Sequence, residues 1–203
     1  MSPLQNDLTQ NEEALIINEV LHGDVNAYKK IIAQNQKLVA ALVYKMVHRK
    51  EDREDLCQEI FLKVYEKLNS FRFQSKLSTW IANIAFNHCI NFLKKKKTFF
   101  LNGIYKDSES DEENIGEDYA SELRSLDKNP DQLIANKELS LYLQKSMESL
   151  SLIQKTIVHF FHQNDFSLDE IATITGLPLN TVKSHLFRAR TILKSEMLKY
   201  LNH

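Results

Sequence analysis

The sequence is poor in the residues that make tight turns and covalent links. Its 203 residues include only four glycines, three prolines and two cysteines. An all-β sandwich or barrel needs many turns, so this scarcity argues against one. A hydrophobic content of 43% is nevertheless ample for packed cores. The chain is therefore predicted to be globular and mainly helical.

Features of membrane, metal and catalytic proteins are also missing. No apolar run reaches the roughly 18 residues of a membrane span, and the polar start MSPLQNDLTQNEE has no signal-peptide core. Cys57 and Cys89 lie in apolar helical patterns without metal-site spacing, so we expect buried free thiols. His159 and His162 are three residues apart, but no third ligand with suitable spacing accompanies them. A cytoplasmic protein that needs no cofactor and is not an enzyme is predicted.

The net charge of -1 hides a strong separation of charge along the chain. Residues 45–97 carry 12 basic and 6 acidic side chains, a net charge of +6. Residues 98–135 carry 3 basic and 10 acidic side chains, a net charge of -7. Residues 171–203 carry 5 basic and 1 acidic side chain, a net charge of +4. The two basic segments could attract phosphates, or they could be ordinary solvated helix faces.

Hydrophobic periodicity predicts four helices in the first half. Apolar residues recur at three- and four-residue spacing over 12–21 and 25–47, with a break near Gly23 and Asp24. A third helix, EDLCQEIFLKVYEKL, has an apolar stripe at steps of four, widened by Cys57, Phe61 and Tyr65. A loop, NSFRFQSKLS, precedes a fourth helix, TWIANIAFNHCINFLKKKK, whose lysines suit a helix C-terminus or phosphates.

An acidic segment then separates two predicted domains. The stretch DSESDEENIGEDYASE contains eight carboxylates in sixteen residues and no cation. We expect a flexible linker over 98–130, between a first domain at 10–97 and a second at 131–200. The predicted fold is all-α, with two small helical domains.

The last part of the chain predicts a helix-turn-helix. Ser167 and Glu170 form a Ser-x-x-Glu capping box, so one helix should start at Leu168 and end at Gly176. A second helix can begin after Pro178 and bury one side at steps of four, three and four, through Val182, Leu186, Ala189 and Leu193. Two short helices joined by a Gly-containing turn make this motif.

The outer side of the second helix carries donors and cations. It presents Asn180, Lys183, Ser184, Phe187, Arg188 and Thr191, as a helix lying in the major groove requires. His185 lies beside this arc and could reach a phosphate or remain a neutral surface residue. An αα-hairpin that only packs is the alternative interpretation.

Two blocks of the sequence resemble a known family. EIATITGLPLNTVKSHLFRAR resembles region 4 of the extracytoplasmic-function sigma factors, the reversible specificity subunits of bacterial RNA polymerase. DREDLCQEIFLKVYEKLNSF and LSTWIANIAFNHCINFLKKKK resemble their region 2. The resemblance covers most of residues 25–97 and 131–197, in the family's order. It implies a non-enzymatic factor that directs promoter-specific transcription initiation, in response to an envelope or environmental signal.

The resemblance also implies partners and roles. Core RNA polymerase would dock on the exposed side of the third helix, through Asp55, Gln58, Glu59 and Leu62. The loop from Asn69 to Ser78 and the following helix would open the minus-ten element and hold an extruded base, through Phe71, Arg72, Phe73, Gln74, Asn83, Asn87, Lys94, Lys95, Lys96 and Lys97. The second helix of the motif would read the minus-thirty-five element through Asn180, Lys183, Ser184, His185, Phe187 and Arg188. An anti-sigma factor is a further candidate partner.

Some points stay open at this stage. His185 stands where the family often has Arg, Leu150-Ser151 replaces a usual Leu-Pro, and Asn83 replaces a common basic residue. Trp80 is assigned to the core. The acidic linker is either a simple tether or, as in the family, a polyanion in the RNA path of the polymerase. A dimeric helix-turn-helix repressor and a polymerase-binding adaptor that does not read DNA are the competing functions.

Overall fold

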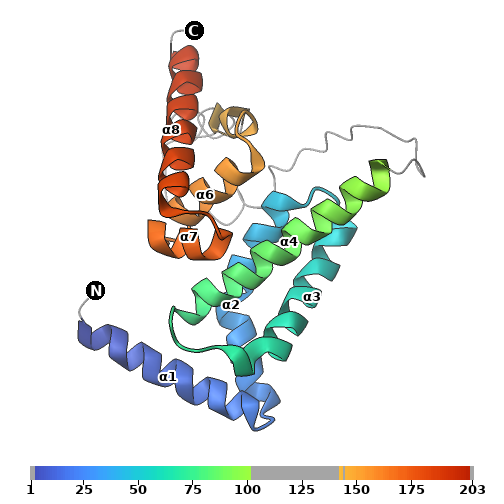
Figure 1. Cartoon of the computed structure of the whole chain (residues 1–203), viewed down its shortest axis with the longest axis vertical. Coiled ribbons are helices and arrows are strands. Elements are labelled where there is room, and N and C mark those ends of the chain that lie inside the picture. The colour runs from blue at the N-terminus through green and yellow to red at the C-terminus, as the bar shows by residue number, and fades with distance from the viewer. Residues whose placement is uncertain (1–2, 102–141, 144, 202–203) are drawn as a thin grey trace, which may run out of the picture.

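The computed structural model describes residues 3–101, 142–143 and 145–201, and all regular structure in these ranges is helical (Figure 1). The N-terminal half contains α1 (Pro3–Leu21), α2 (Val25–Met46), α3 (Lys50–Lys67), the short 3-10 helix η1 (Leu68–Ser70) and α4 (Leu77–Leu101). The C-terminal half contains α6 (Leu152–His162), α7 (Leu168–Thr175) and α8 (Leu179–Leu201). The all-α prediction is confirmed.

Helix ends follow local signals in the sequence. Gly23 adopts a φ of +94°, and Asp24 then caps α2 by accepting hydrogen bonds from the backbone N–H groups of Asn26 at 2.7 Å and Ala27 at 3.3 Å. The predicted break near Gly23 is therefore present. At the other end of this half, α4 continues to Leu101, so the first residues of the predicted linker are helical. The rest of that linker lies outside the described residues.

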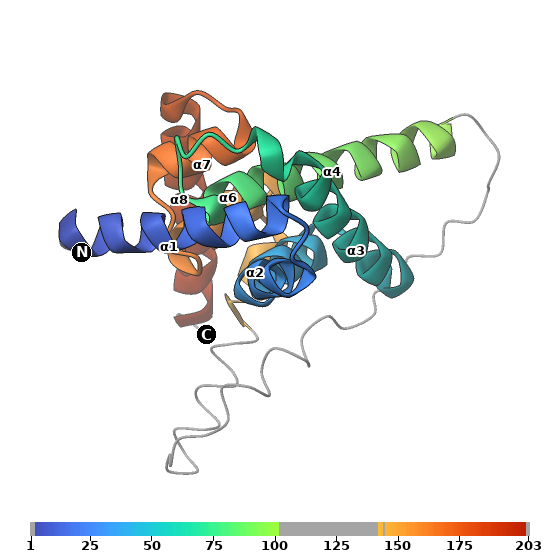
Figure 2. The same ribbon diagram turned by 90° about the horizontal axis from the view of Figure 1, so that it is seen from below.

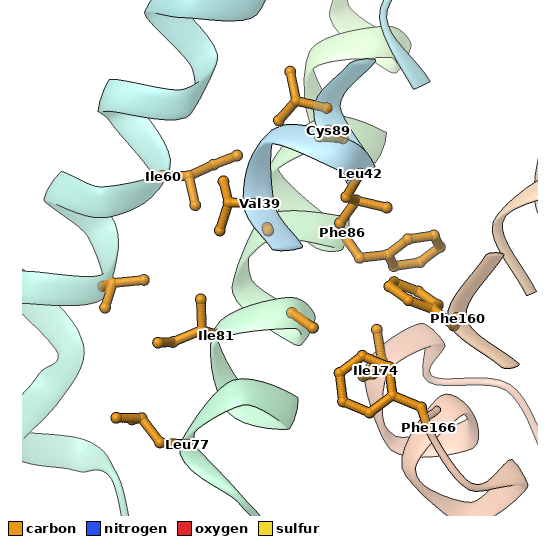
Figure 3. Close-up of a cluster of buried hydrophobic side chains, with 14 of the residues drawn as sticks. Val39, Leu42, Ile60, Leu77, Ile81, Phe86, Cys89, Phe160, Phe166 and Ile174 are labelled. Carbon is orange, nitrogen blue, oxygen red and sulfur yellow. The ribbon is translucent and has the colours of Figure 1, made fainter. Parts of the chain in front are cut away.

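Helix α2 lies at the centre of the N-terminal half and contacts α1, α3 and α4. Its buried side carries Ile31, Val39 and Leu42. Val39 and Leu42 lie in the same core cluster as Ile60 of α3 and Ile81 of α4 (Figure 3). The predicted stripe of α3 is buried at Leu56, Ile60, Val64 and Leu68. Tyr65 differs, because half of it is exposed and its ring packs against that of Tyr28, with centroids 5.0 Å apart.

The core continues without a break into the C-terminal half. Helix α6 contacts α2, and α7 packs along α4, so these helices lie beside the N-terminal part of α4 (Figures 1 and 2). Phe160, Phe166 and Ile174 of this half face Leu42 and Phe86 of the other (Figure 3). Two halves that the sequence predicts as separate domains thus share a buried apolar contact.

Candidate nucleic-acid interface

The helix-turn-helix is built by the signals that the sequence contains. The Ser167 backbone N–H donates to Glu170 Oε2 at 2.9 Å, and the Glu170 N–H donates to Ser167 Oγ at 3.2 Å, which completes the capping box of α7. Gly176 ends the helix in the left-handed region at φ +68°, with its N–H donating to Ala172 O at 2.9 Å. Helix α8 begins directly after Pro178. The predicted motif is confirmed.

Helix α8 separates a packed side from an open side. Val182, Leu186 and Ala189 are buried, while Leu193 is half-buried. The opposite side is exposed, and the Phe187 side chain has 72% of its surface open to solvent. We call this the α8 face, and its exposed members from the sequence prediction are Asn180, Lys183, Ser184, Phe187 and Arg188.

Ser184 and His185 are less free than the other residues of this region. The Ser184 hydroxyl donates to the Asn180 carbonyl at 2.8 Å, which orients it along the helix. His185 is half-buried at the edge of the face, and its Nδ1 is buried with no hydrogen-bond partner among the described residues. His185 is therefore less accessible than Lys183 or Arg188.

The outer side of α3 presents the residues predicted to bind polymerase. Asp55, Gln58 and Glu59 are exposed, and Leu62 is 63% exposed although it is apolar. We call Asp55, Gln58, Glu59 and Leu62 the α3 face. Glu59 also accepts from His88 Nε2 of α4 at 2.7 Å, so this face is tied to the neighbouring helix.

The loop between η1 and α4 combines a buried aromatic ring with an exposed one. Phe71 is 6% exposed and packs against Trp80, whose ring centroid is 5.4 Å away. Phe73 is 44% exposed and adopts a φ of +56°, a left-handed conformation that is uncommon for a non-glycine residue. Arg72 and Gln74 are exposed beside it. Phe71 and Trp80 thus support the loop, and Phe73 presents its ring to the surface.

The predicted DNA-binding amides of α4 meet α7. Asn83 Nδ2 donates to the carbonyl oxygens of Thr173 and Ile174, both at 3.0 Å. Asn87 is exposed, and its Nδ2 donates to the Asn83 carbonyl at 2.9 Å. Sequence reasoning missed the contact with α7. No local signal marks this contact, because Asn83 looks like an ordinary polar residue on an amphipathic helix.

The lysine run at the end of α4 is divided. Lys94 and Lys95 are exposed. Lys96 is half-buried, pairs with Asp52 of α3, and places its ammonium 4.9 Å from the centroid of the Phe92 ring. The side chain of Lys97 lies outside the described ones. Lys96 therefore holds α4 against α3 through its ion pair with Asp52, although the sequence analysis predicts that it contacts DNA.

A buried ionisable group lies where α6 meets α2. His159 is 4% exposed, and neither ring nitrogen has a hydrogen-bond partner within the described ranges. Burial, and then the charge of Lys45 on α2, lower the pKa of His159 to about 4. Burial likewise lowers the pKa of Lys45. In the part of the chain that the structure describes, no three His, Cys, Asp or Glu side chains gather as a metal site, and no helix is long and apolar enough to span a membrane.

Two conserved regions of one protein family match the two halves of the chain. Sigma-70 region 2 matches residues 31–99, which include most of α2, all of α3 and α4 up to residue 99. Sigma-70 region 4 matches residues 140–193, which include α6, α7 and most of α8. The chain is therefore a protein of the sigma-70 class. It is 30% identical over 191 residues to the ECF RNA polymerase sigma-E factor of Escherichia coli strain K12, covering 93% of this chain and 95% of that one. It is 29% identical over 182 residues to the ECF RNA polymerase sigma factor SigW of Bacillus subtilis, and the match covers 89% of this chain and 94% of that one.

Two solved structures share the fold. One is the sigma factor RpoE in complex with the anti-sigma factor NepR from Bartonella quintana, with a TM-score of 0.60 and 20% identity over 85% of this chain and 98% of that chain. The other is CnrH in complex with the cytosolic domain of CnrY, with a TM-score of 0.60 and 14% identity over 90% and 95%. The chain belongs to the extracytoplasmic-function sigma factors, and its function is promoter-specific transcription initiation.

Proposed function

We propose that this sigma factor uses three separate faces for its three contacts. The α3 face binds core RNA polymerase, the loop and outer side of α4 bind the minus-ten element, and the α8 face reads the minus-thirty-five element. The observation that carries the proposal is the α8 face itself. It holds Lys183 and Arg188 beside a Phe187 that is 72% exposed, on a helix whose other side is packed.

The chemistry of the α8 face fits the major groove. Arg and Lys can donate to guanine O6 and N7, and an aromatic ring can contact the methyl group of thymine. An exposed Phe187 is unfavourable in water, so a partner surface would give it a role. Arg188 and Lys183 can also neutralise phosphates, which would add affinity without sequence preference.

The α3 face fits a protein partner. Leu62 offers apolar area, surrounded by Asp55, Gln58 and Glu59, and a small apolar patch with a polar rim is the usual anatomy of an interface. The bond from His88 fixes the Glu59 carboxylate before binding. Such pre-orientation lowers the entropy cost of association.

In the loop between η1 and α4, the side chains proposed to contact the minus-ten element are Phe73, Arg72 and Gln74. An exposed ring can stack on an unpaired base, and neighbouring side chains can bond its edge. Asn87, Lys94 and Lys95 are the exposed polar and cationic members on α4. Phe71 would position Phe73, since their ring centroids are 4.8 Å apart.

We further propose the remaining features expected for this family. The functional units are 10–97 and 131–200, joined by the acidic segment 98–130. The protein acts in the cytoplasm, without an enzymatic activity of its own, and an envelope or environmental signal controls it. Its similarity to sigma factors solved with anti-sigma factors supports a protein regulator of this kind.

Run-off transcription tests the proposal. Purified protein is added to core RNA polymerase on a library of genomic fragments, and the RNA ends are sequenced. We expect a set of start sites that share two upstream motifs and that core polymerase alone does not use. No factor-dependent transcript, or operator binding by a dimer without polymerase, would contradict it.

Matched variants assign the polymerase contact. Gln58→Ala combined with Glu59→Lys should weaken binding to core polymerase, because it removes one polar contact and reverses a charge. Lys67→Glu on the same helix is the control, since it also reverses a charge and Lys67 is exposed on a different side of α3 from the α3 face. Equal affinity of the two variants would show that the α3 face is not the docking site.

A further inference from the structure

Helix α1 borders the loop that is proposed to bind the minus-ten element. The family match to region 2 begins at residue 31, so α1 lies outside it. Its inner side is nevertheless buried, through Ile17 and Val20, and it contacts both α2 and η1 (Figure 1). The loop begins where η1 ends, at Ser70. A helix that the family match leaves out therefore lies beside the loop of residues 71–76.

The residue at the start of helix α4 cannot cap it. The Lys76 carbonyl accepts the first hydrogen bond of the helix, from the Trp80 N–H at 3.1 Å, so Lys76 occupies the capping position. The first N–H groups of a helix have no partner within it, and a lysine side chain has no acceptor to offer them. Leu77 follows and is buried, so its N–H needs an acceptor from another element.

A carboxylate of α1 supplies that acceptor. Glu13 is half-buried, and the Leu77 N–H donates a hydrogen bond to its carboxylate, with the Lys76 ammonium nearby. Burial raises the pKa of Glu13, and the hydrogen bond from Leu77 and the charge of Lys76 oppose this effect without cancelling it. A carboxylate beside the first turn also suits the positive end of the helix dipole. Glu13 thus completes the start of α4 from a different helix.

The loop before this point has an unfavourable backbone conformation. Phe73 adopts a φ of +56°, which costs free energy for a residue with a side chain and persists only where the surroundings hold it. At one end of the loop, the Phe71 ring packs on Trp80. At the other end, the Leu77 N–H is bound by Glu13. Because the loop is short, the position of the exposed Phe73 ring depends on both of these contacts.

Lys76 has a second carboxylate partner, which isolates the Leu77 contact. Glu170 of α7 accepts from Lys76 Nζ at 3.0 Å. Removal of the Glu13 carboxylate therefore leaves Lys76 paired, whereas the Leu77 N–H loses its acceptor. A buried donor without a partner is costly. We expect the first turn of α4 to shift until it regains an acceptor, and the end of the loop to move with it.

We propose that Glu13 is a positioning residue for recognition of the minus-ten element. By holding the start of α4, it fixes the end of the loop and so the place where Phe73 presents its ring to an extruded base. This inference rests on the proposed function of the loop. It goes further in giving α1 a part in promoter recognition, through a contact inside the protein.

Three variants separate the hydrogen bond from the charge. Glu13→Ala removes the acceptor, and Glu13→Leu removes it while keeping a side chain of similar size in the half-buried position. Glu13→Gln keeps an oxygen that can accept from Leu77 but has no charge. Glu12→Ala is the matched control, because Glu12 is the exposed neighbour of the same residue type on the same helix.

The first readout is base discrimination at the minus-ten element. Each variant is bound to core RNA polymerase, and transcription from a promoter recovered by run-off transcription is compared with transcription from copies altered one base pair at a time in that element. Loss of one hydrogen bond corresponds to about a two- to tenfold change. Glu13→Ala and Glu13→Leu should lose discrimination by up to that factor. Glu13→Gln should recover most of it, and Glu12→Ala should match the parent.

The second readout follows the loop more directly. A single-stranded oligonucleotide that carries the minus-ten element is titrated into the complex of each variant with core polymerase. Glu13→Ala and Glu13→Leu should bind it more weakly by the same factor, while their affinity for core polymerase stays at the parent's value. Glu13→Leu makes the result independent of any cavity that Glu13→Ala leaves.

A purely structural role for Glu13 has a different result, because it lowers transcription from all templates alike and leaves discrimination unchanged. That result, or an equal loss of discrimination in Glu12→Ala, would overturn the inference. Failure of the proposed function is distinguishable, since the parent itself would then show no preference at the minus-ten element. A parent that discriminates, with Glu13→Ala and Glu13→Leu that discriminate equally well, contradicts the role of Glu13 alone.

Discussion

The two surfaces proposed to read the promoter differ in what lies against them. On α8, Lys183, Phe187 and Arg188 are exposed, and the packed side of the helix is entirely separate. On α4, the Asn83 amide is paired with the end of α7. A neutral amide with two donors can be half-buried against two carbonyls at a lower desolvation cost than a cation. A basic residue at this position would be harder to cover, so Asn83 suits the contact between α4 and α7.

The largest expected effect comes from the buried apolar contact between the two halves. Phe160 is fully buried between the halves (Figure 3). Phe160→Ala should destabilise the protein by about 3–5 kcal/mol, through lost burial and a residual cavity. Urea unfolding followed by circular dichroism measures the change.

Phe187→Ala is the matched control for this substitution, because the same residue type is 72% exposed on the open surface. Its stability should stay within about 0.5 kcal/mol of the parent, while its transcription should fall. Equal destabilisation by the two substitutions would mean that the α8 face is also packed in solution.

A second effect is a pH dependence of stability, which comes from His159 at the buried contact between the two halves. The pKa of His159 is lowered to about 4 from an ordinary value of 6.5, so the unfolded chain binds more protons between these values. This contribution to stability is fully present above pH 6.5 and is lost as the pH falls toward 4, by up to about 3 kcal/mol. The urea midpoint of the parent should fall relative to that of His159→Leu as the pH falls, because only the parent carries this titrating group. Parallel pH profiles would contradict the assignment.

Local signals explain why much of this structure could be predicted from the sequence. The capping box at Ser167, the turn at Gly176 and the start after Pro178 act within a few residues, and each is present as expected. The stripe of α3 depends only on helical periodicity, so its buried and exposed sides were also predictable. Tyr65 was the exception, because its ring packs at the edge of the core against Tyr28.

The contact between the halves could not be predicted, because nothing local specifies it. Asn83 and Glu170 are far apart in the chain, and each looks like an ordinary polar residue on an amphipathic helix. The positions of Phe71 and Lys96 could not be predicted for the same reason. One is buried against Trp80 and the other pairs with Asp52, although their residue types alone suit nucleic acid equally well. The α8 face was predictable because no other element of the described chain competes for its cations.

The open surface should carry base discrimination. Arg188→Ala or Lys183→Ala should lose about 1–3 kcal/mol of preference at one base pair if the residue contacts guanine, or lower affinity on all templates alike if it contacts phosphate. Transcription from promoters altered one base pair at a time distinguishes the two roles. If both variants transcribe every template as the parent does, α8 is not the recognition helix. Lys199→Ala, in the last turn of the same helix and outside the α8 face, is the control and should transcribe as the parent does.

The smallest expected effect compares one amide from each surface. Asn83→Ala removes a donor from the end of α7 and should lower the stability of the free protein by about 1 kcal/mol, the usual net value of such a hydrogen bond. Asn180 is exposed on α8, so Asn180→Ala should change stability by less than about 0.5 kcal/mol. Hydrogen exchange sharpens the test, because Asn83→Ala should speed exchange in α7 while Asn180→Ala leaves it unchanged. Identical exchange in the two variants would mean that α7 is already detached from α4 in solution, and the difference between the covered and open surfaces would then disappear.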